Sequence, residues 1–213
     1  MSAAATAARR EVLHRRGVRL EVFTAAWNAV EGVVAIGAGI ATGSVSLIGF
    51  GADSFIEVIS AVALLWRLRE AGPDASAEER GAAEKRALYL VATFFLLAAY
   101  ICYEAAGALL SGEGPEDSAV GLVLSVVSLL VMPALAYGKQ RTGREMGSEA
   151  LKADATETWV CSYLSLALLV GVGLNAAFGW WADPAGALAM LPVILWQGWE
   201  TLGEAREGGE NTK

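Results

Sequence analysis

Histidine and cysteine are scarce in this sequence, and charged side chains are few. The 213 residues contain one histidine, two cysteines and 18% charged residues. Both cysteines, Cys102 and Cys161, fall inside long apolar stretches, so a structural disulfide is not expected. A formal net charge of −7 argues against nucleic acid as a partner. The sequence also lacks a nucleophile elbow, a phosphate loop and a Cys-x-x-Cys motif, so it shows none of these enzyme signatures.

Apolar residues dominate the chain instead. Hydrophobic residues make up 55% of the sequence and the mean hydropathy is +0.46, which is too apolar for an ordinary soluble domain. Apolar runs of about 20 residues, the length that crosses a bilayer as a helix, predict six spans. They fall at about 20–42, 44–66, 87–110, 118–138, 154–178 and 184–203. We therefore expect an all-α integral membrane protein, built as a six-transmembrane-helix bundle.

Basic residues predict how these spans are oriented. All 16 Lys and Arg residues lie before the first span, between the second and third, between the fourth and fifth, or after the sixth. Because Lys and Arg beside short loops stay on the cytoplasmic side, both termini are predicted to be cytoplasmic. The expected organisation is a basic cytoplasmic segment at 1–16, a six-helix transmembrane domain at 17–203 and a short cytoplasmic tail at 204–213. The expected location is a bacterial-type plasma membrane, which the chain crosses several times.

Two acids lie deep in the second predicted span. Asp53 and Glu57, in the stretch "GFGADSFIEV", are four residues apart and so project from one face of a helix. An ionised carboxylate in hydrocarbon costs at least a few kcal/mol, so acids placed there are usually protonated, hydrogen-bonded or facing a cation. A pair on one face can hold one cation together.

A second group of candidate ligands opens the fifth span, in "LKADATETWVCS". Glu157 and Cys161 are also four residues apart, and Asp154 precedes Glu157 by three. At 1.5 Å per residue, Asp53 lies about 14 Å below the outer edge and Cys161 about 11 Å above the inner edge. Both therefore lie near the middle of a core about 30 Å thick. Asp53, Glu57, Glu157 and Cys161 are predicted to meet as four O and S ligands of a tetrahedral divalent ion.

Other polar residues in the spans are second-rank candidates. Asp154 is expected at the cytoplasmic mouth, where helix N-capping competes with ion capture. Glu31 and nearby Asn28 in the first span are candidates too, as is Glu104 towards the outer end of the third. Hydrogen bonding between helices is the alternative role for the two acids. Glu21 is expected to be hydrated near the inner interface. No Lys or Arg is expected at the deep positions.

Three stretches of the chain resemble the cation diffusion facilitator family of metal transporters. The stretch "NAVEGVVAIGAGIATGSVSLIGFGADSFIEV" at 28–58 is similar to that family's first hairpin, with a Gly-Ser turn followed by an acid pair. The stretch "SEALKADATETWVCSYLSL" at 148–166 resembles the start of its fifth helix. The stretch "WWADPAGALAMLPVILWQGWE" at 180–200 resembles its sixth helix, with an Asp-Pro start.

The resemblance implies a transporter, not an enzyme, that exports a divalent ion in exchange for protons. Its ligands would be Asp53 and Glu57 from the second helix with Glu157 and Cys161 from the fifth. The family usually has His or Asp in place of Glu157 and Asp in place of Cys161. The histidine-rich loop of many zinc members is absent, and the cytoplasmic domain that usually follows the sixth helix and takes part in dimerisation is expected to be missing.

Zn²⁺ is the first choice for the transported ion, and Mn²⁺, Fe²⁺, Co²⁺ and Cd²⁺ stay open. No permanent cofactor is expected. The expected partners are the metal ion, protons and the lipid bilayer, with a homodimer as a further prediction and no nucleic acid. The alternatives are a passive cation channel, which could use the same acids, and an intramembrane metal-dependent enzyme.

Overall fold

The structure is a computed structural model that describes residues 3–70 and 77–210, and it is helical throughout apart from short connections. These residues form six α-helices and no strand. The helices are α1 (Ala3–Thr42), α2 (Val45–Glu70), α3 (Ala77–Ser111), α4 (Ala119–Met146), α5 (Glu149–Phe178) and α6 (Ala182–Glu210). Five of them, α1 to α5, are long and apolar enough to span a membrane. The prediction of an all-helical membrane bundle is confirmed.

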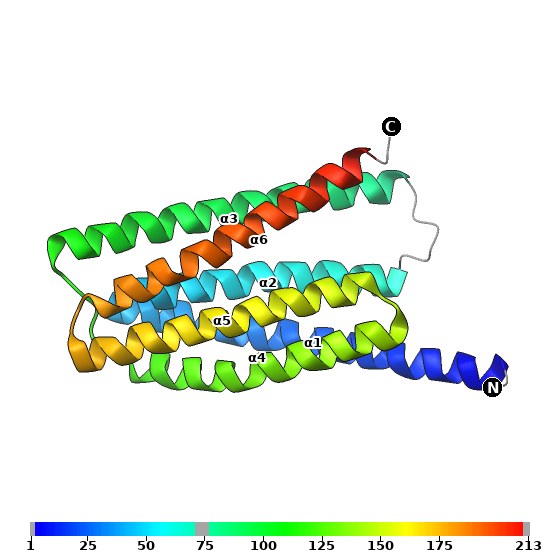
Figure 1. The fold of residues 1–213 in the computed structure, drawn as a ribbon, viewed down its shortest axis with the longest axis horizontal. Helices are drawn as coiled ribbons and strands as arrows, with labels where there is room; N and C mark the ends of the chain where they lie inside the picture. The colour runs from blue at the N-terminus through cyan, green and yellow to red at the C-terminus, as the bar shows by residue number, and fades with distance from the viewer. Residues whose placement is uncertain (1–2, 71–76, 211–213) are drawn as a thin grey trace.

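The helices lie side by side in one bundle (Figure 1). Helices α1, α3 and α5 run in one direction and α2, α4 and α6 in the other, so α1 begins at the end of the bundle at which α2, α4 and α6 end. Helix α2 contacts α1, α3, α5 and α6, and α5 contacts α4 as well as α2 and α6. Helix α2, which carries two of the predicted ligands, therefore has the most neighbours, and it contacts α5, which carries the other two.

Exposed and buried side chains follow the pattern expected in lipid. Large apolar side chains face outward, with Ile40 and Leu130 each 71% exposed and Leu110 88% exposed. Acidic, hydroxyl and amide side chains lie inside the bundle, including Asp53 and Asn28. Polar groups in a membrane bundle turn to its interior because lipid cannot hydrogen-bond them. The polar interior is where a site for ions can form.

Asp183 fixes the start of α2. The Ser44 hydroxyl donates to Asp183 at 2.6 Å, the backbone N–H of Val45 donates at 3.0 Å, and both the hydroxyl and the backbone N–H of Ser46 donate as well. A carboxylate is favourable at this position because the helix N-terminus carries free N–H groups and a partial positive charge. Asp183, in the first turn of α6, thus caps the N-terminus of α2, and both of its carboxylate oxygens accept hydrogen bonds.

Glycines allow α1 and α2 to pack closely beside the predicted ligands. A Cβ atom at Gly51 would lie 3.0 Å from the carbonyl oxygen of Gly32 and 2.7 Å from a side-chain carbon of Ile36. These positions therefore leave no room for a side chain, and the two backbones approach at the level of Asp53. This contact places the α1 side chains within reach of the acids on α2.

Helix α4 is longer than predicted. The fourth span was expected to end at residue 138, with Lys139 in a cytoplasmic loop. Instead α4 continues to Met146, and its end is capped by Gly147, whose φ of 67° is left-handed and whose N–H reaches the carbonyls of Gly143 and Arg144. Lys139 consequently lies within the helix and is buried.

Candidate metal centre

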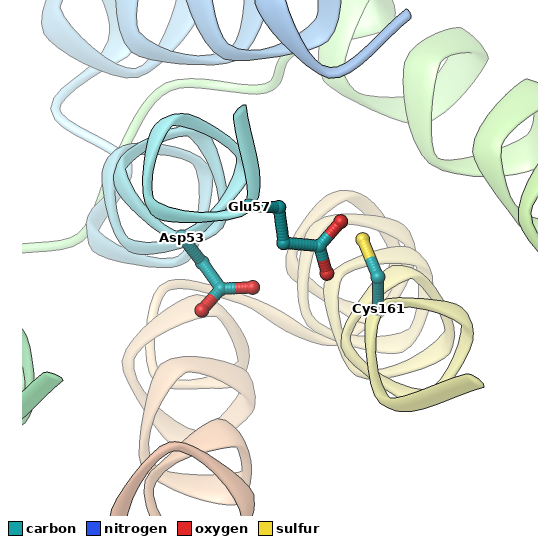
Figure 2. A group of neighbouring side chains, drawn as sticks. All are labelled: Asp53, Glu57 and Cys161. Atoms are coloured by element: carbon teal, nitrogen blue, oxygen red, sulfur yellow. The ribbon is translucent and has the colours of Figure 1, made fainter. Parts of the chain in front are cut away.

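Three of the four predicted ligands meet between α2 and α5. One ligand atom from each of Asp53, Glu57 and Cys161 lies within 4.8 Å of the other two. Figure 2 shows the Glu57 carboxylate and the Cys161 sulfur pointing toward one another, with Asp53 one turn along α2. Asp53 and Cys161 are fully buried and Glu57 is 6% exposed. This spacing is small enough for one ion to contact all three side chains.

The carboxylates of this group lack partners on most of their oxygens. Among the described residues, both oxygens of Asp53 and Oε1 of Glu57 are buried without a hydrogen-bond partner. Buried polar atoms are nearly always satisfied, and a buried anion without a partner is costly. Oxygens left open in this way fit a role as ligands of a cation, or as carriers of protons when no cation is bound.

Asn28 on α1 orients Glu57. Its side-chain amide donates to Oε2 of Glu57 at 2.6 Å, and both residues are buried. Glu57 Oε1 is thereby left for another ligand. Asn28, a second-rank candidate by sequence, is thus a hydrogen-bond donor to one of the predicted ligands.

Glu157 lies outside the three-residue group. It is half-buried on α5 and accepts a hydrogen bond of 3.0 Å from the Ser60 hydroxyl of α2. Glu57 and Glu157 both line a cavity of about 10 Å³, together with Gln197 and others. That is close to the space one water molecule needs. The fourth predicted ligand therefore lies with Glu57 on the wall of a small cavity and is not part of the three-residue group.

The second-rank candidates differ in their surroundings. Glu31 is fully buried on α1, and neither of its carboxylate oxygens has a hydrogen-bond partner among the described residues. Glu104 is partly exposed on α3 and does not join the three-residue group. Asp154 does not cap α5, because Ser148 takes that place by accepting from the N–H of Leu151 at 3.3 Å. The N-capping alternative for Asp154 is wrong.

A buried cation was missed by the sequence analysis. Lys139 is 1% exposed, and its ammonium contacts Glu21 at 3.2 Å, Asp154, and the Thr158 hydroxyl at 3.2 Å. Glu21 is fully buried, so the expectation that it is hydrated is wrong. The expectation that no Lys lies deep was wrong because the fourth span was ended at residue 138, directly before Lys139, whereas α4 continues to Met146.

The fold and the three-residue group define a class of protein, an integral membrane protein of several spans that encloses a buried group of potential metal ligands. A family model described as the cation efflux transmembrane domain matches residues 22–207. The chain therefore belongs to the cation efflux family, which is the family that the sequence resembles. Members of this family are transporters and not enzymes, so the enzyme alternative is set aside.

Two bacterial proteins illustrate the relationship. The chain is 31% identical over 174 residues to the uncharacterised transporter sll1263 of Synechocystis sp., covering 79% of this chain and 56% of that protein. It is 27% identical over 154 residues to the cation-efflux pump FieF of Shewanella oneidensis, covering 70% of this chain and 51% of the pump. The chain thus spans just over half the length of these relatives.

Proposed function

We propose that this protein exports a divalent transition-metal ion through the centre formed by Asp53, Glu57 and Cys161. The observation that carries the proposal is the group itself: three ligand atoms within 4.8 Å of one another, from side chains that are all buried. The open oxygens of the two acids support it further. Family membership supports the direction, because the FieF relative is named a cation-efflux pump.

Glu157 is the proposed fourth ligand. It lies on α5 one turn before Cys161, and it lines the same small cavity as Glu57. A rotation of its side chain into that cavity would complete a set of four ligands, two from α2 and two from α5. Four O and S ligands suit a tetrahedral ion. Zn²⁺ is therefore our first choice, and Mn²⁺, Fe²⁺, Co²⁺ and Cd²⁺ are to be tested beside it.

Protons are the proposed counter-ion. Moving a +2 ion outward against an inside-negative potential costs about 4.6 kcal/mol per 100 mV. One proton entering offsets half of this cost, and two offset all of it. The coupling would occur at Asp53 and Glu57, because a metal ion binds the deprotonated ligands and its binding therefore releases protons. Exposing the site alternately to each side would complete the cycle.

Transport into proteoliposomes tests the proposal. The vesicles carry a pH-sensitive dye, and each divalent ion is added to the wild type and to Asp53→Asn, which keeps the size of the side chain and removes its charge. We expect one metal to move with opposite proton flux in the wild type, and neither flux in the variant. Glu113→Gln is the control, because Glu113 is an exposed acid of the α3–α4 connection; this variant should transport normally.

The other outcomes test separate parts of the proposal. A passive channel would move metal without moving protons. That result would leave the proposed metal centre standing and refute proton exchange. Movement that survives Asp53→Asn would refute the assignment of the ligands. A measurement of proton release on metal binding, made on the protein in detergent without any gradient, tests the coupling independently.

A further inference from the structure

A second polar cluster lies inside the bundle, apart from the metal centre. Lys139 of α4 is held by Glu21 of α1 and by Asp154 and Thr158 of α5, so three helices meet at one ammonium group. All four side chains are buried. A buried charge in a membrane bundle is expensive and is commonly found on ion pathways. The metal centre described above makes no use of this cluster.

The cluster is in line with the metal centre along two parallel helices. Glu21 precedes Asn28 by seven residues on α1, and Asp154 precedes Cys161 by seven on α5. Two helical turns, about 10 Å, therefore separate the cluster from the centre on both helices. Buried threonines continue from the cluster towards the centre: Thr24 on α1 and Thr158, itself part of the cluster, on α5 are both 2% exposed.

The cluster lies on the side from which an exported ion would come. Helices α1 and α5 both begin at the end of the bundle where α2 and α4 end (Figure 1), and the basic residues assign that end to the cytoplasm. Glu21 and Asp154 precede the metal centre on these helices. An ion moving from that end towards the metal centre between these helices would meet the two carboxylates first.

The charges of the cluster do not balance. Two carboxylates face one ammonium, which leaves one negative charge uncompensated when all three groups are ionised. Oε1 of Glu21 is buried and has no hydrogen-bond partner among the described residues. A divalent ion in place of the ammonium would balance both carboxylates, and it could use the open oxygen.

We propose that Glu21 and Asp154 form an entry station for the divalent ion, which Lys139 occupies as a tethered cation in this conformation. The entering ion takes the place of the ammonium between the two carboxylates and then moves on to the metal centre. While no ion is present, the Lys139 ammonium takes the place of the ion between the two carboxylates. This inference rests on the proposed export of a divalent ion.

Zinc-binding stoichiometry tests the station separately from the centre. Zn²⁺ bound at equilibrium is measured by dialysis of the purified protein in detergent, for the wild type and three variants. Asp53→Asn should lose the ion of the metal centre. Adding Lys139→Met, which keeps the length of the side chain without its charge, should restore one ion per chain at the vacated station. Adding Glu21→Gln as well should abolish this gain.

Each outcome has one meaning. If Lys139→Met adds no zinc to the Asp53→Asn protein, or if the added zinc survives Glu21→Gln, the station is refuted. If Asp53→Asn binds as much zinc as the wild type, the metal centre is refuted, and the station is still judged by the gain that Lys139→Met causes. Co²⁺ identifies the occupied site, because thiolate ligation by Cys161 gives a charge-transfer absorption that oxygen ligands do not give.

A single substitution provides a second test if the Lys139→Met proteins do not fold. Glu21→Gln leaves one carboxylate for one ammonium, a neutral pair that a divalent ion displaces less readily. We expect slower zinc transport with an unchanged zinc affinity of the metal centre. Glu11→Gln is the matched control, since Glu11 is an exposed acid of the same helix. Transport at the wild-type rate, or a joint loss of rate and affinity, would overturn the proposal.

Discussion

Asn28→Ala should weaken metal binding although the metal centre keeps all its ligands. The amide of Asn28 donates a hydrogen bond of 2.6 Å to Glu57, and Oε1 of the same carboxylate is left without a partner. Without the donor, the Glu57 side chain is free to rotate, and the metal must order it. Losing a partner that orients a metal ligand typically costs 10–100-fold in affinity. This corresponds to about 1.4–2.8 kcal/mol, in the range of a lost hydrogen bond to a charged group.

The assay is competition for Zn²⁺ between the protein in detergent and a chromophoric chelator, with thermal unfolding measured on the same samples. Asn175→Ala is the matched control. Asn175 is also a buried amide, and it donates to the carbonyl of Pro115 at 3.3 Å and to Asp117 at 3.2 Å, in the α3–α4 connection. It should lower stability without changing zinc affinity. Equal losses of affinity in the two variants, or no loss in either, would refute the reasoning.

Asn28→Asp separates the role of donor from the role of ligand. A carboxylate can bind a metal ion, but it cannot donate a hydrogen bond while it is ionised, and it would face the Glu57 carboxylate. If Asn28 acts by donating to Glu57, this variant should lose affinity at least as much as Asn28→Ala. Zinc affinity retained in Asn28→Asp would instead make residue 28 a direct ligand.

Three further predictions concern the ligands and the packing around them. Cys161→Ser should lower the affinity for Cd²⁺ much more than that for Mn²⁺, because a hydroxyl is a harder ligand than a thiolate; Cys102→Ser, at an exposed position, should change neither in a binding titration. Asp183→Asn should lower the free energy of unfolding by about 1–3 kcal/mol, since a charge-assisted cap of α2 is lost. A lower unfolding temperature together with an unchanged zinc affinity would confirm a purely structural role. Gly51→Ala should force α1 and α2 apart and weaken zinc binding, because its Cβ would lie 2.7 Å from the nearest α1 side chain, whereas Gly37→Ala meets no atom within 4 Å and should leave binding unchanged.

The helices and the grouping of Asp53, Glu57 and Cys161 could be predicted from the sequence because most of their signals are local. Apolar runs of the length of a bilayer mark spans, and the i, i+4 spacings of Asp53 with Glu57 and of Glu157 with Cys161 each fix one helix face. The depth of a residue follows from the rise per residue, which correctly placed Cys161 at the level of the α2 acids. The face and the depth of each residue required no knowledge of how the helices pack, whereas the contact of α2 with α5 was suggested by the resemblance.

The partners of the other acids could not be predicted, because they depend on which helices touch. The pairing of Asp183 with the start of α2 joins residues more than 130 positions apart, and Glu21 is separated from Lys139 by 118. A cation at residue 139 was assigned to a loop because charge lowers the hydropathy of a helix end. Helix α4 continues past it, since the carboxylates of α1 and α5 satisfy the ammonium inside the bundle.

Buried acids in this bundle fall into two kinds, and the difference lies in their partners and not in their burial. Asp183 is as deeply buried as Asp53, yet it accepts hydrogen bonds from four donors, whereas neither oxygen of Asp53 has a partner among the described residues. An acid whose oxygens are all satisfied has no capacity left for an ion, and substituting it should cost stability alone. An acid with open oxygens is stable in the interior only when a proton or a cation joins it. Transport of an ion in exchange for protons needs the second kind, because both occupants must be able to leave.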